Sequence, residues 1–393
     1  MRVLLVSSRF PLPPWRGNQL RTVQWLDALG DCDRVLACPV GAGEELPPEL
    51  GVELVGIPGG RVSAAAGAAA AFAARRPMQE GIYDTRAARH RLRELIDTLR
   101  PDVVVAQMVR CGWAAEIAAE APCSPALIFD AIDCMSLHFD RAAPDAPLAL
   151  RPLYRMEARR CRQREGELVR RSRATAAVSR RDLEALGAGS RGRVVTVACG
   201  AEVDEVDGGV REPVVLLSGN LGYAPTVRAA VRFAREVWPA VRRAVPAARW
   251  VLAGARPAAA VRRLAGTPGV ELHGDVADLA PYLKRAAVAV APMASGSGVP
   301  IKILEALAAG VPVVADPWSA AGLHDPTAVV VVGDSAAWAT ALERLLSDPG
   351  AAREQASRGL RAWRADYHPE VVRRQIRDVV CNAVESGSEP AEG

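Results

Sequence analysis

Two series of short, continuously apolar segments restrict the fold of this chain more than any other feature of its sequence. The first series comprises residues 3–6, 34–37, 52–57, 103–106, 126–129 and 174–178, and the second comprises residues 213–219, 249–254, 270–274, 288–293, 311–316 and 328–333. Continuous rather than alternating apolarity predicts strands that are buried on both faces, as in parallel sheets covered by helices. We therefore predict an α/β fold with two Rossmann-like, doubly wound parallel sheets.

The joint between the two sheets is expected in the segment CGAEVDEVDGGVREP, residues 199–213, where Gly, Asp and Pro interrupt the apolar pattern. This predicts an N-terminal domain over residues 1–204 and a C-terminal domain over residues 205–367. An amphipathic helix over residues 368–386 is expected to pack back on the N-terminal domain, and the polar residues 387–393 are expected to be disordered.

The composition excludes several classes of protein. A net charge of +4 is too small for a whole-protein nucleic-acid footprint. The longest apolar tract, residues 64–74, is shorter than the ~20 residues that a membrane span needs. The 8 cysteines contain no C-x-x-C pair, which predicts reduced thiols, no zinc site and a cytoplasmic protein.

Positive charge is concentrated between residues 141 and 193, where 14 arginines stand against 6 acidic residues. Much of this excess falls on a predicted helix over residues 151–173, in which glutamates are interspersed among the arginines. One interpretation is an ordinary solvated helix. The other is a surface for anionic lipid or an acidic acceptor, which would place the protein at the inner face of a membrane.

The segment GSGVPIKILEALAAGVPVV, residues 296–314, contains Lys302, one of only two lysines among the 49 basic residues. Because nearly all other basic residues are arginine, the lysine at position 302 indicates that a compact ammonium group is needed there. Pro300 and Gly310 mark the start and the end of a short helix. Backbone N–H groups of Gly298 and Val299 would then lie at its positive end, which is either an anion site or a plain loop.

Lys302 and Glu305 are three residues apart and therefore share one face of this helix. They could form a modest surface ion pair. Alternatively, the ammonium could neutralise a diphosphate while the carboxylate accepts hydrogen bonds from a vicinal diol such as ribose. No G-x-G-x-x-G follows a predicted strand, so a dehydrogenase is disfavoured.

At these residues the chain resembles the retaining GT-B glycosyltransferases of the glycosyl transferases group 1 family. The segment ILEALAAGVPVVA is similar to the family's second conserved glutamate and the helix that follows it, which gives Glu305 the role of holding the nucleotide ribose. The family's first glutamate would fall at Ser297, so the pair is incomplete. A sugar-transferase subgroup has G-x-x-x-K-x-LEA, which Gly298, Lys302 and Glu305 match.

The resemblance extends over nearly the whole chain. The segment GNLGYAPT is similar to a loop in which many relatives hold the diphosphate with an arginine, here replaced by Asn220, so the resemblance gives that role to Lys302. It implies backbone contacts to the nucleobase from VELHGDV and a helix beginning at Gly17 that points toward the diphosphate. The implied donor-binding residues are Gly17, Gly219, Asn220, His273, Gly274, Val276, Gly296, Ser297, Gly298, Val299, Lys302 and Glu305.

Two further polar candidates follow a buried strand in FDAIDCMSLHFDR. Asp133 resembles part of a D-x-x-D segment of the subgroup and could bind the acceptor hydroxyl or the transferred sugar, or merely cap a helix. His138 could touch substrate or be structural. With Lys302 and Glu305, these two complete the set of candidate catalytic residues.

These features predict a metal-independent enzyme, because no Asp-x-Asp or His cluster suggests a divalent ion. It is expected to move a hexose-type sugar, with retention, from a UDP- or GDP-linked donor to a hydroxyl of a small molecule, a lipid-linked sugar or a glycan. No separate cofactor and no nucleic-acid partner are expected. Two alternatives stay open: a nucleotide-sugar hydrolase or epimerase of similar fold, and a catalytically idle GT-B module that serves as a partner or membrane-surface scaffold.

Overall fold

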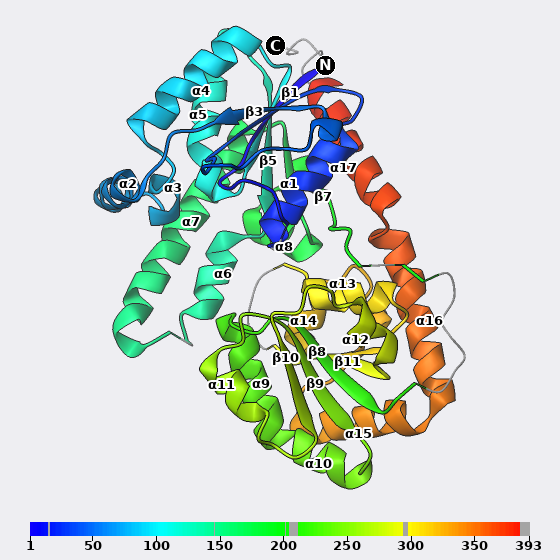
Figure 1. Ribbon diagram of the computed structural model, residues 1–393. Helices are drawn as coiled ribbons and strands as arrows, with labels where there is room; N and C mark the ends of the chain where they lie inside the picture. Colours follow the sequence, from blue (N-terminus) through cyan, green and yellow to red (C-terminus); the bar gives the residue numbers. More distant parts are fainter. Residues whose placement is uncertain (15, 145, 201, 204–210, 294–297, 386–393) are drawn as a thin grey trace. The chain divides into compact units, whose positions relative to one another are not determined.

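The computed structural model describes residues 1–14, 16–144, 146–200, 202–203, 211–293 and 298–385 (Figure 1). The chain forms two compact units. Unit 1 comprises Met1–Val197 and Glu370–Gly393, and unit 2 comprises Ala198–Pro369. The predicted boundary between residues 204 and 205 and the predicted disordered tail 387–393 lie outside the described residues.

Unit 1 is built on a parallel sheet with the strand order β3-β2-β1-β4-β5-β6-β7. The strands are β1 (Arg2–Val6), β2 (Asp33–Cys38), β3 (Val52–Gly56), β4 (Val103–Gln107), β5 (Ala126–Ile132), β6 (Ala174–Ala177) and β7 (Gly192–Val194). The chain runs outward from β1 to β3 and then crosses to β4 on the other side of β1. The strand order therefore reverses between β1 and β4. The short strand β7 has no long apolar run, so the sequence pattern did not predict it.

Helices cover this sheet (Figure 1). They are α1 (Gly17–Ala28), α2 (Arg61–Ala73), α3 (Met78–Gly81), α4 (Arg86–Leu99), α5 (Gly112–Glu120), α6 (Met135–Ala142), α7 (Arg151–Arg171), α8 (Arg180–Leu186) and the 3-10 turns η1 (Pro48–Leu50), η2 (Val109–Cys111), η3 (Leu148–Leu150) and η4 (Gly189–Arg191). The C-terminal helix α17 (Pro369–Glu385) packs on unit 1. Its Gln375 side chain accepts hydrogen bonds of 2.9 Å from the backbone N–H and the hydroxyl of Thr196, and Arg373 pairs with Asp27 at 2.6 Å.

A buried ion pair fixes the carboxyl end of β5 in unit 1. Arg21 and Asp130 are both 0% exposed and approach to 2.8 Å. Arg21 also donates to the backbone oxygens of Val195 and Thr196 at 2.7 and 2.9 Å. These hydrogen bonds satisfy the guanidinium, as a buried charge requires.

Unit 2 is a second parallel sheet, with the order β10-β9-β8-β11-β12-β13. Its strands are β8 (Val214–Asn220), β9 (Arg249–Ala255), β10 (Val270–Gly274), β11 (Val288–Ala291), β12 (Val313–Ala315) and β13 (Val330–Val331). Its helical segments are α9 (Ala224–Glu236), α10 (Trp238–Ala244), α11 (Ala259–Leu264), α12 (Ala280–Arg285), α13 (Ile301–Ala308), α14 (Pro317–Ala320), η5 (Pro326–Ala328), α15 (Ser335–Ser347) and α16 (Pro349–Asp366). Here the strand order reverses between β8 and β11.

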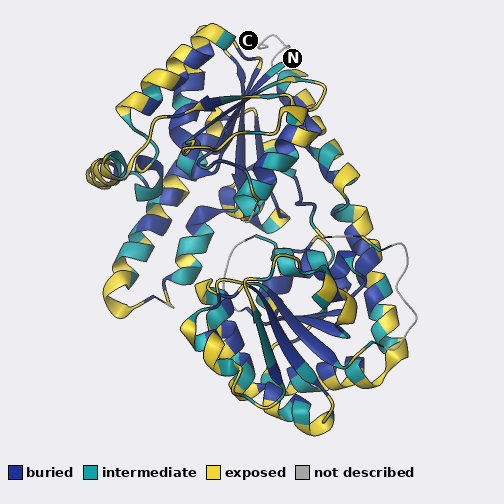
Figure 2. Ribbon diagram, viewed as in Figure 1, coloured by how far each residue is buried: buried dark blue, intermediate teal, exposed yellow. Residues whose placement is uncertain are grey.

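Burial explains why the apolar runs predicted these sheets. Figure 2 shows the strands of both sheets largely buried and the outer faces of the helices exposed. On one side of the unit 2 sheet, Phe233 packs against Trp250 and Trp338 with ring centroids 4.7 and 5.6 Å apart. Strands packed on both faces leave no position for a polar side chain, so the apolarity is continuous.

Candidate functional site

The residues singled out around Lys302 lie at the topological switch point of unit 2. β8 ends at Asn220, its neighbour β11 ends at Ala291, and α13 follows β11. Open α/β sheets bind ligands at the point where the strand order reverses. Among the described residues, no side chain caps the N-terminus of α13 at Pro300, and the positive end of this helix favours an anion. The predicted donors Gly296 and Ser297 lie outside the described residues.

Two glycines allow the backbone to pack closely beneath this point. Gly219 has a φ of +107° and Gly254, beside it on β9, has a φ of +153°. A Cβ atom on Gly254 would lie 1.7 Å from the Gly219 carbonyl oxygen, which no side chain tolerates. A Cβ atom on Gly219 would lie 3.7 Å from both Cε and Nζ of Lys302. The Lys302 side chain therefore extends over the end of β8.

Burial perturbs the pKa of both candidate charged groups on α13. It lowers the pKa of Lys302 to about 8 and raises the pKa of Glu305 to about 7, and the charge of each partly offsets the shift of the other. Neither side chain forms an ion pair with another described residue, so they are not the surface pair that their spacing allows. Two desolvated groups of opposite charge, which interact electrostatically without forming a close ion pair, are typical of a ligand site.

The predicted nucleobase segment lies at the end of β10, on the same edge of the sheet. His273 is half-buried, with its ring 5.1 Å from that of Tyr282. Gly274 is exposed and Val276 is half-buried. Between them Asp275 has a φ of +54° and donates its N–H to the Gly254 oxygen at 2.6 Å. This turn leaves the backbone after His273 at the edge of the sheet.

The neighbouring polar candidate has a local structural partner. The Asn220 side-chain oxygen accepts a hydrogen bond of 3.0 Å from the Gly222 N–H and so stabilises the turn after β8. An amide carries no charge, so Lys302 is the cation among the candidate residues described at this switch point.

Unit 1 contains the remaining candidates. Gly17 is the first residue of α1, whose N-cap Arg16 is extended and provides no side-chain cap. Asp133 directly follows β5, and His138 lies in α6. Burial lowers the pKa of His138, and the charges of Arg110 and Arg141 lower it further, so the imidazole is neutral at pH ~7.

Arg110 is a residue that the sequence pattern missed. It follows β4, burial lowers its pKa, and the nearby carboxylate of Asp133 acts in the opposite direction. Asp133 and His138 therefore both lie close enough to the Arg110 guanidinium to interact with its charge, beyond the ends of β4 and β5. The sequence feature that could have indicated Arg110 is its position just after a buried strand.

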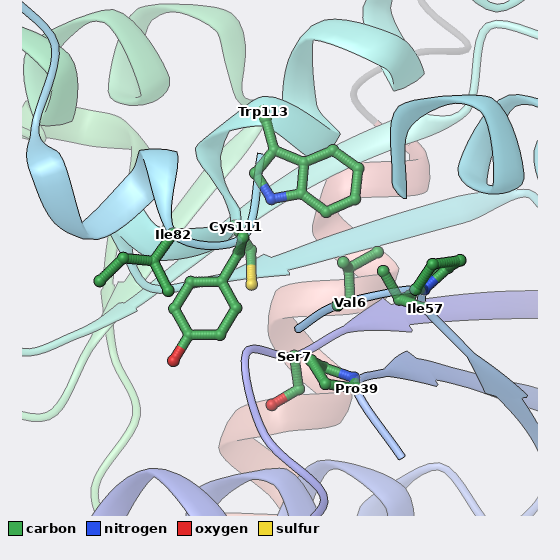
Figure 3. Close-up of a pocket in the computed structure, with 10 residues that line it drawn as sticks. Val6, Ser7, Pro39, Ile57, Ile82, Cys111 and Trp113 are labelled. Carbon is green, nitrogen blue, oxygen red and sulfur yellow. The ribbon is translucent and has the colours of Figure 1, made fainter. Parts of the chain in front are cut away.

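A small cavity opens at the same edge of the unit 1 sheet (Figure 3). It lies at the ends of β1, β2 and β3 and is lined by Val6, Ser7, Pro39, Ile57, Pro58, Gly59, Ile82, Tyr83, Cys111 and Trp113. Most of these side chains are apolar. The indole Nε1 of Trp113 is buried and has no hydrogen-bond partner among the described residues. The sequence pattern did not find this cavity, because its residues come from five separate segments.

Within the ranges that the structure describes, no three His, Cys, Asp or Glu residues are grouped so that they could hold a metal ion.

Known proteins share this architecture. A family model described as "Glycosyl transferases group 1" matches residues 212–348. The sucrose-phosphate synthase of Thermosynechococcus elongatus is 16% identical, with a TM-score of 0.71 over 98% of this chain and 99% of that one. Anabaena Alr3699/HepE in complex with UDP-glucose is 14% identical, with a TM-score of 0.63 over 97% and 99%.

A third similar structure is the α,α-trehalose 6-phosphate synthase of Burkholderia multivorans, which is 16% identical with a TM-score of 0.64 over 100% of this chain and 99% of that one. No curated protein matches the chain by sequence. The structural likenesses confirm the predicted GT-B fold, and residues 212–348 match the model of the family that the sequence resembles.

Proposed function

We propose that this chain, a glycosyltransferase by its group 1 domain over residues 212–348 and its GT-B fold, moves a hexose-type sugar from a nucleoside diphosphate to an acceptor hydroxyl with retention. The observation that carries the proposal is the position of Lys302 over Gly219 at the switch point, with Glu305 one helical turn further along α13. A cation and a carboxylate separated in this way match the diphosphate and the ribose of one donor.

The proposed donor contacts follow from charge. The Lys302 ammonium and the open N-terminus of α13, with Gly298 and Val299, neutralise the diphosphate oxygens. The Glu305 carboxylate accepts two hydrogen bonds from the ribose hydroxyls. We propose uridine as the first base to test, because the similar HepE structures contain UDP and UDP-glucose. Guanosine is the alternative.

Charge stabilisation in the proposed reaction comes from the protein itself. As the bond between the anomeric carbon and the diphosphate breaks, Lys302 and the helix dipole stabilise the charge that develops on the leaving oxygen. The acceptor oxygen forms its bond on the face from which the diphosphate departs, and the departing phosphate oxygen takes the acceptor proton. We therefore propose a metal-independent reaction without a covalent enzyme intermediate.

The acceptor is proposed to bind to unit 1. The apolar cavity at the ends of β1–β3 and the polar group formed by Asp133, His138 and Arg110 are the two features available there. In this proposal Asp133 accepts a hydrogen bond from the acceptor hydroxyl or from the sugar, and neutral His138 assists its orientation. We also propose that the protein is cytoplasmic. The basic helix over residues 151–173 would then contact the inner face of a membrane.

Calorimetric titration of the whole chain with UDP and with GDP, in the presence of a chelator, tests the donor site. Micromolar binding of one nucleotide that Glu305→Ala weakens at least about tenfold would support the proposal. Binding of neither would favour the idle module. Product analysis with and without acceptors then separates transfer from hydrolysis or epimerisation, because only transfer makes nucleotide release depend on the acceptor.

A further inference from the structure

Helix α7 directs two of its three glutamates inward. In sequence its glutamates are interspersed among its arginines, but in the structure Glu157 and Glu165 are 4% and 1% exposed. Glu157 accepts a hydrogen bond of 3.0 Å from the Met78 N–H. Glu165 accepts hydrogen bonds of 2.6 and 3.2 Å from the N–H groups of Met135 and Ser136. These two acids hold α3 and α6 in place and contribute nothing to the surface charge.

The buried arginine of α7 has acidic partners, whereas four of its five exposed arginines have none among the described residues. Arg164 pairs with Glu80 at 2.7 Å and with Glu116 at 2.6 Å. Five arginines of α7 are exposed: Arg162, which pairs with Asp140, and Arg155, Arg159, Arg170 and Arg171. None of the last four guanidinium groups has an acidic partner within the part of the chain that the structure describes. The solvent side of α7 therefore carries four arginines without an acidic partner, beside the paired Arg162 and the half-exposed Glu167.

Helix α2 presents an apolar face to solvent. Val62 is 86% exposed, and Phe72, near the other end, is 48% exposed. The exposed residues Val62, Ala65, Ala66, Ala69, Ala70 and Ala73 recur at the spacing of a single helical face. This face carries no side chain that can donate or accept a hydrogen bond. A helix face of this kind, left uncovered in a folded unit, indicates an interaction surface.

The two helices are fixed neighbours at one edge of unit 1, where Figure 1 shows α2 beside α3 and α7. Gly67 of α2 packs directly on α3, because a Cβ atom on Gly67 would lie 2.0 Å from the Gly81 oxygen. The guanidinium of Arg160 lies 4.7 Å from the centre of the Phe72 ring and donates to the Phe72 oxygen at 3.0 Å. Contacts at the middle and at the C-terminal end of α2 thus hold its apolar face beside the exposed arginines of α7.

We propose that α2 and α7 form a docking surface for an anionic lipid bilayer. No helix within the described ranges is long and apolar enough to cross a membrane. Helix α2, at ~20 Å long, instead suits a position in the plane of the interface. Its methyl groups would enter the acyl boundary while the neighbouring arginines bind the headgroups. A protein partner fits less well, because the alanine face offers neither hydrogen bonds nor large side chains that would specify one.

The η3 turn extends the apolar character of this edge. It leads directly into α7, and its Leu148 and Leu150 side chains are 77% and 44% exposed. The cavity of unit 1 lies near α3, because Ile82 and Tyr83 line it and directly follow Gly81, on which α2 packs. If the proposed function holds, a bilayer bound at α2 would therefore present lipid-borne acceptors next to that cavity.

Flotation of the full chain with vesicles tests the docking without any measurement of activity. The vesicles are phosphatidylcholine alone and an equimolar mixture of phosphatidylcholine and phosphatidylglycerol. We expect binding to the anionic vesicles only, and a loss of roughly a hundredfold or more for Arg155→Glu/Arg159→Glu. The matched control is Arg243→Glu/Arg361→Glu, which makes the same change in net charge on exposed arginines of unit 2 and should retain binding.

A second variant tests the apolar face. Val62→Gln/Ala69→Gln keeps the charge and the helix propensity and is expected to weaken binding to anionic vesicles severalfold. Unchanged nucleotide binding and far-UV circular dichroism verify that the variants are folded. The proposal is overturned if the chain binds neither vesicle or if the control variant loses binding equally. It is also overturned if concentration-dependent dimers form that the α2 variant abolishes, because the apolar face would then bind a second copy.

Discussion

Raising the pH should weaken nucleotide binding by an amount that the surroundings of Lys302 determine. With the pKa of Lys302 lowered to about 8, roughly three quarters of these side chains are charged at pH ~7.5 and roughly one tenth at pH ~9. If only the charged form binds the diphosphate, the affinity for UDP should fall about eightfold over this interval. A lysine with its ordinary pKa would remain charged at both values, and the affinity would hardly change.

The direction of the effect follows from the cause of the shift. Burial disfavours the charged form of Lys302 in the free protein, so a rise in pH through about 8 removes the positive charge before UDP arrives. Bound diphosphate favours the charged form and should raise the pKa again. Binding at pH ~8.5 should therefore be accompanied by proton uptake.

Calorimetry in two buffers with different ionisation enthalpies measures both the affinity and the proton uptake. The Lys302→Ala variant, titrated over the same pH range, corrects for titration of the nucleotide itself. It should bind UDP about tenfold or more weakly at pH ~7.5. The Lys302→Arg variant keeps its charge at pH ~9 and should lack the eightfold loss.

Two results would refute the reasoning in different ways. Equal affinities of wild type and Lys302→Ala at pH ~7.5 would mean that the ammonium does not contact the diphosphate. A clear effect of Lys302→Ala combined with a flat pH profile would mean that the contact exists but burial does not lower the pKa of the lysine.

Three further predictions concern other parts of the two units. Glu305→Ala should weaken UDP binding about tenfold or more, and a UDP analogue without ribose hydroxyls should not discriminate between the variant and the wild type in calorimetry. Asp130→Ala leaves the buried guanidinium of Arg21 unpaired and should lower the free energy of unfolding by about 3–5 kcal/mol, measured by urea denaturation; an unchanged midpoint would contradict this. Gly254→Ala forces a Cβ atom against the Gly219 oxygen and should lower both Tm and UDP affinity, whereas a variant with wild-type Tm would show that the strands can separate at little cost.

Most of the fold could be predicted from the apolar runs of the sequence alone. Strands buried on both faces must be apolar throughout, so a local pattern predicts them regardless of what they pack against. The same holds for α13, where Pro300 and Gly310 mark the boundaries that the structure reproduces within two residues. The three-residue strand β7 escaped prediction, because it is too short to carry a pattern.

The sequence also predicted that Lys302 and Glu305 share a face, because that relation depends only on helical spacing. Only the tertiary structure put Lys302 over Gly219, since that contact depends on the order in which β8 and β11 pair. Likewise, the sequence of α7 gave the number of its charges but not their directions. Burial of Glu157 and Glu165 against neighbouring helices decided which charges reach the solvent. Periodicity is a local property of the chain, whereas strand order and the partners of a buried charge arise only when distant segments pack together.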